Sequence, residues 1–472
     1  MKPLSRRDFI GQASCAGLGY MTFMNSFLNL KALNAAAISN ASVNDCSGYK
    51  AIVCILFAGG CDSYNMLAPW ELGRHMEYVN TRSGLAIPRN DLLRLKTGSP
   101  GHAARDFAVH PSMPEVRDLF DQDKVAFLAN TGTLLNNTTT KATFNNGTDL
   151  PIGLFSHSDQ IQQWQTGIPS IRSSKGWAGR MADIIGSCNS NQSISMNLSL
   201  SGTNIFQTGN ETIEYALDPY SGSVGIDNYD PESTWLFNEA RTQAIDSLMA
   251  QQYQNIFDKT YVDVIRNAKD AHVEFQAALA NSVEFDTNLF PNTYFGNSLE
   301  MIAKTIDVKD DLDFNRQVFY VVYGGWDHHD ELLNNQTEML GEISEGLSSF
   351  MTGLEQIGRE DDVLTMTISE FGRTLASNGN GSDHAWGGNA MVMGGPNLVN
   401  GGQIYGDYPS LALNTDIELG RGVLIPQQST DEYFAEVAKW FGVTGQDLDL
   451  IFPNLHEFYS SSNPDNPIGF LQ

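Results

Sequence analysis

Residues 51–58 read AIVCILFA, and the glycine-rich segment GGCDSYN follows at 59–65. A continuous apolar run of this length, rich in β-branched and aromatic residues, is typical of a strand covered on both faces of a parallel sheet. Four further runs have the same character: VAFLA (125–129), VFYVVY (318–323), VLTMTI (363–368) and AMVM (390–393). These segments predict the parallel strands of one buried sheet.

Helical patterns separate the predicted strands. Residues 333–357 place apolar side chains at steps of three and four, and Ser429-Thr430-Asp431-Glu432 has the form of a capping box that opens a helix through Trp440. Strands that alternate with helices predict an α/β fold with a doubly wound, mostly parallel sheet. Residues 235–280 have a helical pattern without strand signals, so we expect a largely helical insertion at about 230–285.

The first 37 residues have the form of an export signal. Residues 5–10, SRRDFI, match the twin-arginine pattern, a mildly apolar stretch follows, and Ala35-Ala36-Ala37 fits a small-residue cleavage site. Polar side chains within the stretch make it a poor membrane span. The sequence therefore predicts a signal peptide over 1–37 and one domain over 38–472 with no stable membrane span. The twin-arginine translocase would export it to the periplasm or the exterior.

The chain is strongly acidic, with 55 Asp and Glu against 28 Lys and Arg and a formal charge of −27. Removal of the signal takes away four basic residues and one acidic residue, which makes the charge −30. This balance argues against nucleic acid or an anionic membrane surface as the main partner, because both select basic patches. Four cysteines would remain, enough for one or two disulfides but not for a disulfide scaffold.

Carboxylates and imidazoles lie beside the predicted strand ends, where parallel sheets bind their ligands. A lone histidine is more often structural than a ligand, but four of the nine histidines lie in loops of this kind. Their oxygen and nitrogen donors suit Zn, Mn, Mg, Ca or Fe. Together they predict a functional site at one end of the sheet, formed from Asp62, His157, Asp327, His328, His329, Glu370, Arg373 and His384.

Ordered motifs begin at the twin-arginine start and continue through nearly the whole mature chain: FAGGCDSYNMLAPW (57–70), FAVHPSM (107–113), LFSHSDQIQQWQTG (154–167), GGWDHH (324–329), SEFGRT (369–374), SDHAWGG (382–388), MGGPNLVNGGQIYGDYP (393–409) and RGVLIPQQSTDEYFAEVAKWFGV (421–443). They resemble the exported bacterial family of domain of unknown function 1501. That family is similar in turn to the alkaline phosphatase/sulfatase superfamily. The resemblance implies a doubly wound fold of alkaline phosphatase-like type, with metals bound at the strand ends.

The superfamily resemblance also implies a set of metal ligands. Asp62 matches the first metal-binding Asp, Asp327 and His329 match the Asp/His pair, and His384 matches the final His. Glu370 and Phe371 stand where the superfamily has a metal-binding Asp and His. One nitrogen ligand is therefore lost, which implies a single-metal site or a weakened two-metal site that holds Zn, Mn, Ca or Mg.

The segment Phe155-Ser156-His157-Ser158, ahead of Thr166-Gly167, resembles the nucleophile loop of phosphodiesterases and sulfatases. We expect Ser156 to be the nucleophile, with Ser158 and Ser63 left open. A divalent metal would activate the hydroxyl. Arg373 would either stabilise the transferring group or form a structural bridge to a carboxylate. The predicted activity is hydrolysis of a phosphate or sulfate ester of a small molecule or polymer.

The alternative is a non-catalytic periplasmic protein that binds a metal, or that serves in assembly or at the surface, and keeps the same fold. The missing histidine at Phe371 and the ambiguous serine favour this alternative.

Overall fold

The computed structural model describes residues 45–96, 106–226, 229 and 234–472, so the predicted signal peptide at 1–37 lies outside the described residues. Ten strands of the described residues form one sheet in the order β12-β5-β11-β10-β1-β9-β6-β7-β8, with β13 paired to β5. They are β1 (Lys50–Ala58), β5 (Val125–Gly132), β6 (Asn197–Ser199), β7 (Tyr215–Asp218), β8 (Gly222–Ser223), β9 (Arg316–Gly324), β10 (Val363–Ile368), β11 (Gly388–Met393), β12 (Ile404–Tyr405) and β13 (Gln428–Ser429). All five predicted runs are strands of this sheet.

The sheet is mostly parallel. Strand β1 pairs in parallel with β9 and with β10, and β6 pairs in parallel with β9. Strand β11, in contrast, runs antiparallel to both β10 and β5, so the predicted parallel direction of residues 390–393 is wrong. The reason is the connection: residues 369–387 contain no crossover helix, and neighbouring strands joined without a crossover are antiparallel.

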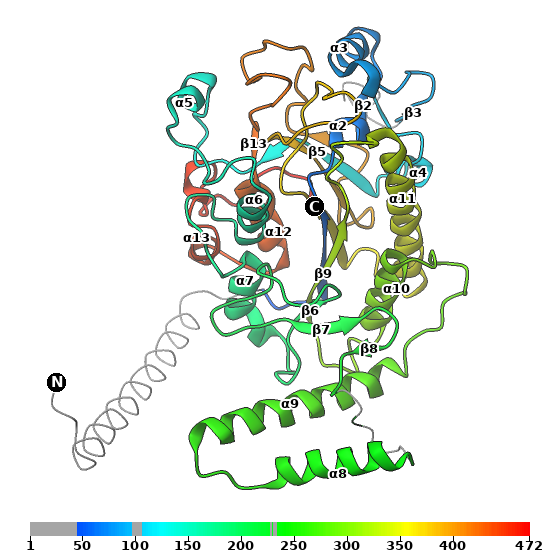
Figure 1. Ribbon diagram of the computed structural model, residues 1–472, viewed down its shortest axis with the longest axis vertical. Coiled ribbons are helices and arrows are strands. Elements are labelled where there is room, and N and C mark those ends of the chain that lie inside the picture. The colour runs from blue at the N-terminus through cyan, green and yellow to red at the C-terminus, as the bar shows by residue number, and fades with distance from the viewer. Residues whose placement is uncertain (1–44, 97–105, 227–228, 230–233) are drawn as a thin grey trace, which may run out of the picture.

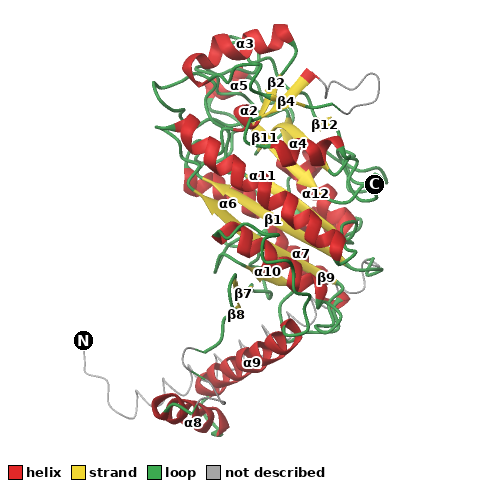
Figure 2. Cartoon of the chain, turned by 90° about the vertical axis from the view of Figure 1, so that its right-hand side faces the viewer, coloured by secondary structure: helices red, strands yellow, loops and turns green. Residues whose placement is uncertain are grey.

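Helices cover both faces of the sheet (Figures 1 and 2). Alternate residues of β1 lie in two different apolar cores, Val53 and Ile55 in one and Ile52 and Cys54 in the other. The first core includes α4 (Pro114–Asp121), α10 (Tyr294–Asp307) and α11 (Leu332–Gln356), and the second includes α7 (Trp177–Ile185), α12 (Thr430–Phe441) and α13 (Gln446–Ile451). This confirms the predicted doubly wound α/β fold.

A small antiparallel sheet, in the order β2-β4-β3, lies beyond the carboxyl ends of the central strands. Its strands are β2 (Leu67–Pro69), β3 (Leu93–Arg94) and β4 (Phe107–Val109). The other short helices of the described residues are α2 (Ser63–Met66), α3 (Leu72–Arg82), α5 (Lys141–Asn146), α6 (His157–Thr166), η1 (Ser83–Leu85), η3 (Gly186–Cys188) and η4 (Leu455–Glu457). Within the predicted insertion, the structure has α8 (Leu236–Ala250) and α9 (Ile256–Leu279). Among the described residues, no helix is long and apolar enough to cross a membrane.

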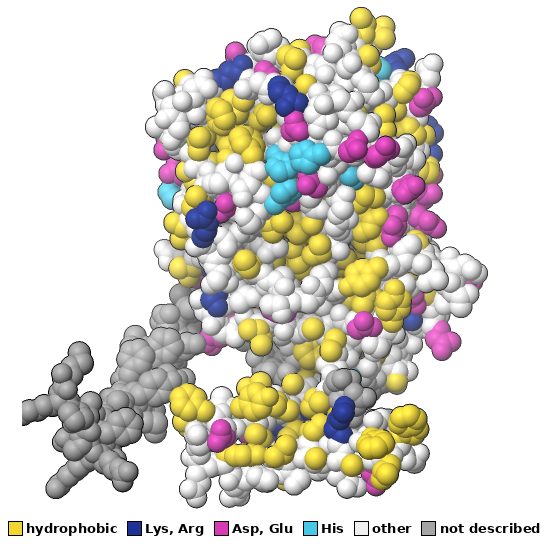
Figure 3. All heavy atoms as spheres, viewed as in Figure 1, with side chains coloured by type: hydrophobic (Ala, Val, Ile, Leu, Met, Phe, Trp, Pro, Cys, Tyr) yellow, Lys and Arg dark blue, Asp and Glu magenta, His cyan; other side chains and the backbone are white. Residues whose placement is uncertain are grey.

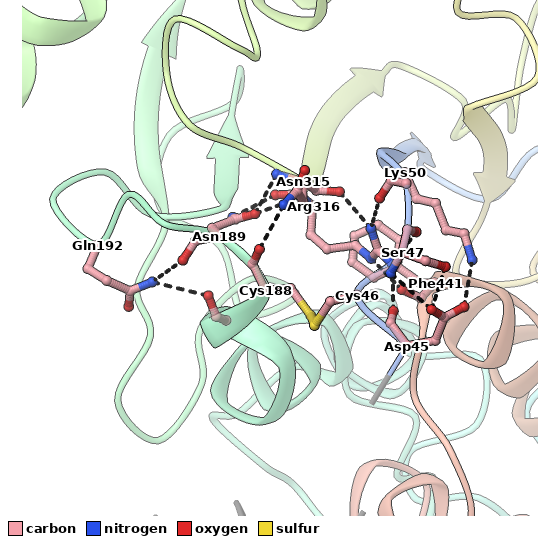
Figure 4. The surroundings of a disulfide bond; sticks show 12 residues. Asp45, Cys46, Ser47, Lys50, Cys188, Asn189, Gln192, Asn315, Arg316 and Phe441 are labelled. Atoms are coloured by element: carbon pink, nitrogen blue, oxygen red, sulfur yellow. Dashed lines mark hydrogen bonds and ion pairs between the residues drawn. A yellow bond between two sulfur atoms is a disulfide. The ribbon is translucent and has the colours of Figure 1, made fainter. Parts of the chain in front are cut away.

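A disulfide ties the segment before β1 to the end of η3 (Figure 4). Cys46 and Cys188 are 142 residues apart in sequence, and their Cα atoms lie 5.2 Å apart. Beside them, the buried Arg316 guanidinium donates hydrogen bonds to the backbone carbonyls of Asp45 and Phe441. Both contacts fix the amino-terminal end of β1. The described cysteines therefore form one disulfide, and Cys54 and Cys61 are buried and free.

Candidate metal centre

Several loops meet at one end of the sheet and bring histidines and carboxylates together. Asp327 and His329 follow β9, while Glu370 and His384 lie on the connection between β10 and β11. His157 is the first residue of α6. Figure 3 shows histidine side chains gathered at one place on this face of the molecule, beside acidic side chains. The cluster lies beyond the carboxyl ends of β9 and β10, as expected for a ligand site of a parallel sheet.

Three imidazoles direct their Nε2 atoms at the carboxylate of Asp327. Oδ1 of Asp327 lies 3.1 Å from Nε2 of His329 and 3.3 Å from Nε2 of His384, and these two nitrogens are 3.1 Å apart. Nε2 of His157 lies 3.5 Å from Oδ2 of Asp327. One nitrogen from each ring therefore faces the same small volume as the carboxylate.

Each of these imidazoles is held through its other nitrogen. Nδ1 of His157 lies 2.9 Å from Oε1 of Glu370, and Nδ1 of His329 lies 3.2 Å from Oδ1 of Asp383. Nδ1 of His384 lies 2.9 Å from the backbone carbonyl oxygen of Phe155. All of these partners are acceptors, so they favour the tautomer with the proton on Nδ1 and leave the lone pair on Nε2 for a metal.

The spacing of the donor atoms fits a bound cation. A tetrahedral Zn²⁺ with bonds of about 2.0–2.1 Å has ligand atoms about 3.3 Å apart. The separations of 3.1–3.5 Å described above are close to this value. The described residues thus contain a group that could hold a metal ion, with ligand atoms of His157, Asp327 and His384 within 4.8 Å of one another and His329 beside them.

The ionisation states also suit metal binding. Burial raises the pKa of Asp327, but the guanidinium of Arg373, whose Nη2 donates to Oδ1 at 2.6 Å, brings the pKa below its ordinary value. Burial lowers the pKa of His384. At neutral pH, Asp327 is therefore a carboxylate and His384 a neutral imidazole, the forms that bind metals.

Glu370, a predicted ligand, lies behind His157. Its carboxylate is fully buried, and Oε1 accepts hydrogen bonds from the backbone N–H of Gly59 at 2.7 Å and from the His157 ring. Oε2 has no hydrogen-bond partner among the described residues. In this arrangement Glu370 contacts the centre through the imidazole of His157.

Asp62, another predicted ligand, pairs with an arginine. Its carboxylate is buried, and Oδ2 lies 2.5 Å from Nη2 of Arg82, which is also buried. Ser382 donates a further hydrogen bond to the same oxygen. His328 is buried nearby, and neither of its ring nitrogens has a partner in the described part of the chain. Nothing in the sequence around Arg82 marks it as the partner of Asp62.

The predicted nucleophile, Ser156, is the N-cap residue of α6. Its backbone is held beside the centre on both sides, because the carbonyl of Phe155 bonds to His384 and the next residue is His157. Phe155 has a φ of +72°, an unusual conformation for a residue with a side chain. The Ser156 hydroxyl lies 3.2 Å from that of Ser158. The hydroxyl of Ser63, the other open candidate, accepts a hydrogen bond from the backbone N–H of Asn389 and has no hydrogen bond to the histidines of the centre.

Phe371 forms an apolar wall of the centre where the resemblance implies a lost histidine. It is buried, and its ring centroid lies 4.9 Å from that of His157 and 4.6 Å from that of His384.

His157 is absent from the ligand set that the resemblance implies. It provides a possible nitrogen ligand from the start of α6. The sequence signal for His157 was its place in a loop of short polar residues before a helix, which does not by itself identify a ligand.

Residues 294–443 match the family described as "Protein of unknown function (DUF1501)". The match confirms the resemblance predicted from the motifs, and its range includes Asp327, His329, Glu370 and His384. His157 lies outside it. No curated protein matches the sequence of the chain.

Several solved structures are similar to this chain. The chain in the crystal structure of Ps i-CgsB is 10% identical in sequence, with a TM-score of 0.36. The matched region covers 89% of this chain and 78% of that one. Lipooligosaccharide phosphoethanolamine transferase A (EptA) from Neisseria meningitidis is 10% identical, with coverages of 91% and 67% and a TM-score of 0.32. A mutant of the alkaline phosphatase PafA is 10% identical, with coverages of 70% and 64% and a TM-score of 0.29. Likenesses at this level carry no argument about activity or substrate.

Proposed function

We propose that this chain is an exported hydrolase of phosphate or sulfate esters that depends on a divalent cation. One observation carries the proposal: three imidazoles, each held at Nδ1 by an acceptor, direct Nε2 at one carboxylate. Imidazole nitrogens favour Zn²⁺ or Mn²⁺ over Ca²⁺ and Mg²⁺, which prefer oxygen ligands. His157, Asp327, His329 and His384 would hold the cation.

The residues around the centre suit an anionic ester. A bound cation would polarise an ester oxygen and lower the pKa of a nearby hydroxyl. Arg373 is fully buried, and its Nε and Nη1 have no partner among the described residues. Buried unpaired donors are costly, and oxygens of a tetrahedral anion would satisfy them. Arg373 would therefore orient both Asp327 and the substrate.

Ser156, the residue before His157, would act as the nucleophile. Its oxygen would form a bond to phosphorus or sulfur as the bond to the alcohol breaks, and the proton lost by the hydroxyl balances the one gained by the alcohol. Water would then cleave the bond to Ser156 and release phosphate or sulfate. The amino-terminal end of α6 favours the negative charge that develops there.

Export by the twin-arginine pathway, to the periplasm or the exterior, is part of the proposal. It is supported by the SRRDFI motif at 5–10 and by the Cys46–Cys188 disulfide, because disulfides persist in oxidising compartments. The translocase would be a transient partner. An ester-bearing small molecule or polymer is the proposed substrate class.

The test uses purified chain stripped of metal with a chelator and reconstituted with Zn²⁺ or Mn²⁺. Bound metal is counted by mass spectrometry, and hydrolysis of aryl phosphate, aryl phosphodiester and aryl sulfate is followed by absorbance. We expect one ion per chain, turnover of at least one ester, loss of the ion in Asp327→Ala, and loss of turnover with the ion retained in Ser156→Ala. His456→Ala, at an exposed histidine outside the centre, should behave as the unchanged chain.

Metal binding without turnover of any ester would reject the hydrolase and favour the non-catalytic metal-binding protein. Absence of metal binding under all of these conditions would reject both.

A further inference from the structure

Helices α8 and α9 form a hairpin that projects from the sheet domain, as both views show (Figures 1 and 2). Among the described residues, the second half of α9 packs into the main core through Ala271, Phe275 and Ala278, which recur at helical spacing. In α8, just Thr242 and Met249 are buried. Most of the hairpin is therefore not covered by the rest of the described chain.

The projecting part is rich in exposed apolar side chains (Figure 3). Four aromatic residues are 65–79% exposed: Trp235, Phe237, Phe257 and Tyr261. Aliphatic residues of both helices are also more than half exposed: Leu236, Leu248, Ile256 and Val264. Single exposed apolar residues are ordinary, but a concentration of them on one small element marks a surface that binds something.

The two helices also enclose an apolar groove of about 430 Å³. Its walls include Ile245, Leu248 and Met249 from α8 and Tyr261, Val262 and Ile265 from α9. A groove of this size accepts large apolar side chains of a partner, as in helix-to-helix recognition.

Charge distinguishes between the classes of partner. The helices α8 and α9 carry four basic and six acidic side chains, a formal charge of −2, whereas the chain as a whole carries −27. The basic residue Arg266 pairs with Asp263, and Lys269 pairs with Asp270. A helix that lies on a membrane surface typically has a polar face rich in Lys and Arg, whereas acidic side chains outnumber basic ones on these two helices. Like-charge repulsion between two copies is smallest at such a nearly neutral element.

We propose that the α8–α9 hairpin is the interface of a homodimer, in which the hairpins of two copies pack against each other as a four-helix unit. The four aromatic side chains, at about 150–250 Å² each, would alone contribute roughly 400–700 Å² per copy at their exposures of 65–79%. The aliphatic residues bring this close to the ~800 Å² per partner of a stable interface. A two-fold arrangement uses the same patch on both copies.

The experiment measures the mass of the purified chain in solution by light scattering during size-exclusion chromatography over a range of concentrations. We expect the mass of two chains at low concentration. The double variant Leu248→Glu, Tyr261→Glu should raise the dissociation constant by more than about 100-fold, because two charges would enter the apolar interface. Ile213→Glu, at an exposed apolar residue outside the hairpin, should leave the dimer intact.

A circular dichroism spectrum like that of the unchanged chain and a cooperative thermal transition will show that the double variant is folded. In a second measurement, we expect amide hydrogen exchange in α8 and in the first half of α9 to slow as the concentration of the unchanged chain rises. A single-chain mass up to about 100 μM overturns the proposal, as does a double variant that dimerises like the unchanged chain. Monomers that sediment with lipid vesicles would overturn it too, in favour of a membrane surface.

Discussion

Nδ1 of His157 lies 2.9 Å from Oε1 of Glu370, and the same oxygen accepts a hydrogen bond from the backbone N–H of Gly59. Gly59 directly follows β1, Glu370 follows β10 and His157 begins α6. One buried carboxylate thus joins two neighbouring strands of the sheet to the helix that carries the ring. Because the bond is to Nδ1, it orients Nε2 toward Asp327.

Glu370→Gln should therefore weaken metal binding without removing a ligand. Carboxylates that hold a metal-binding histidine typically contribute 10–100-fold to metal affinity. We expect a loss in this range for Zn²⁺, measured by competition with a chromophoric chelator, with the fold retained. Glu345→Gln, at an exposed position on α11, should bind Zn²⁺ as the unchanged chain does. An affinity equal to that of the unchanged chain would mean that Glu370 does not position His157.

Gly60 links the first glycine-rich loop to the same centre through Phe371. Gly60 has a φ of +82°, and a Cβ added there would lie 2.3 Å from the Phe371 ring, which packs against His157 and His384. Gly60→Ala should therefore cost about 1–2 kcal/mol of backbone strain and about 1–3 kcal/mol of overpacking. It should also weaken Zn²⁺ binding, because Phe371 must shift.

Gly358→Ala is the control that separates backbone strain from overpacking. Gly358 has a φ of +66°, and an added Cβ would meet nothing within 4 Å. Thermal unfolding and Zn²⁺ titration of both variants will show whether Gly60→Ala loses more stability than Gly358→Ala and alone loses metal affinity. Equal effects of the two substitutions would exclude the contact with Phe371 as the cause.

The apolar runs predicted the strands because a strand buried on both faces leaves a continuous signature in the sequence. The direction of β11 was not predictable from residues 390–393, since direction depends on the connection and not on the strand itself. The small sheet of β2, β3 and β4 was missed because its strands have only two or three residues. Such short segments show no period.

At the candidate site, too, the sequence predicted some residues of the centre correctly by position and did not predict which side chains contact each other. Asp327, His329 and His384 were predicted because each lies close to a strand end, and fold topology brings strand ends together. Glu370 and Asp62 also follow strands, yet their carboxylates contact His157 and Arg82. Which side chain reaches the centre and which supports it depends on a few ångströms of backbone position, and residue order does not encode that distance directly.

A different carboxylate, Asp431, should make the stability of the fold depend on pH. It lies in the first turn of α12, and burial raises its pKa to about 7, although Ser429 donates a hydrogen bond to it. In the unfolded chain the pKa of an Asp is about 3.9. Between these values the folded state keeps a proton that the unfolded state has released, so the stabilising contribution is present at low pH and is lost as the pH rises to about 7.

Asp431→Asn removes this titration. We expect its melting temperature to exceed that of the unchanged chain by about 2–5 °C at pH 8, and the difference to disappear near pH 4. Both chains are measured after metal removal, so that protonation of the histidines at the centre does not contribute through metal release. Asp465→Asn, at an exposed position, should show no such difference. A variant less stable than the unchanged chain at pH 8 would contradict the predicted sign.

The Cys46–Cys188 disulfide should stabilise the fold without affecting the metal centre. It closes a loop across 142 residues, for which the chain-entropy relation gives at most about 5 kcal/mol. It also lies at the amino-terminal end of β1, while the centre is at the carboxyl ends of the strands. We expect the double variant Cys46→Ser, Cys188→Ser to lower the melting temperature by several degrees and to leave Zn²⁺ affinity unchanged.

A reducing agent should destabilise the unchanged chain and not the double variant, since Cys54 and Cys61 are free in both. Equal melting temperatures for the two chains would show that the bond contributes nothing to stability, and a parallel loss of Zn²⁺ affinity would show that the two ends of β1 are coupled.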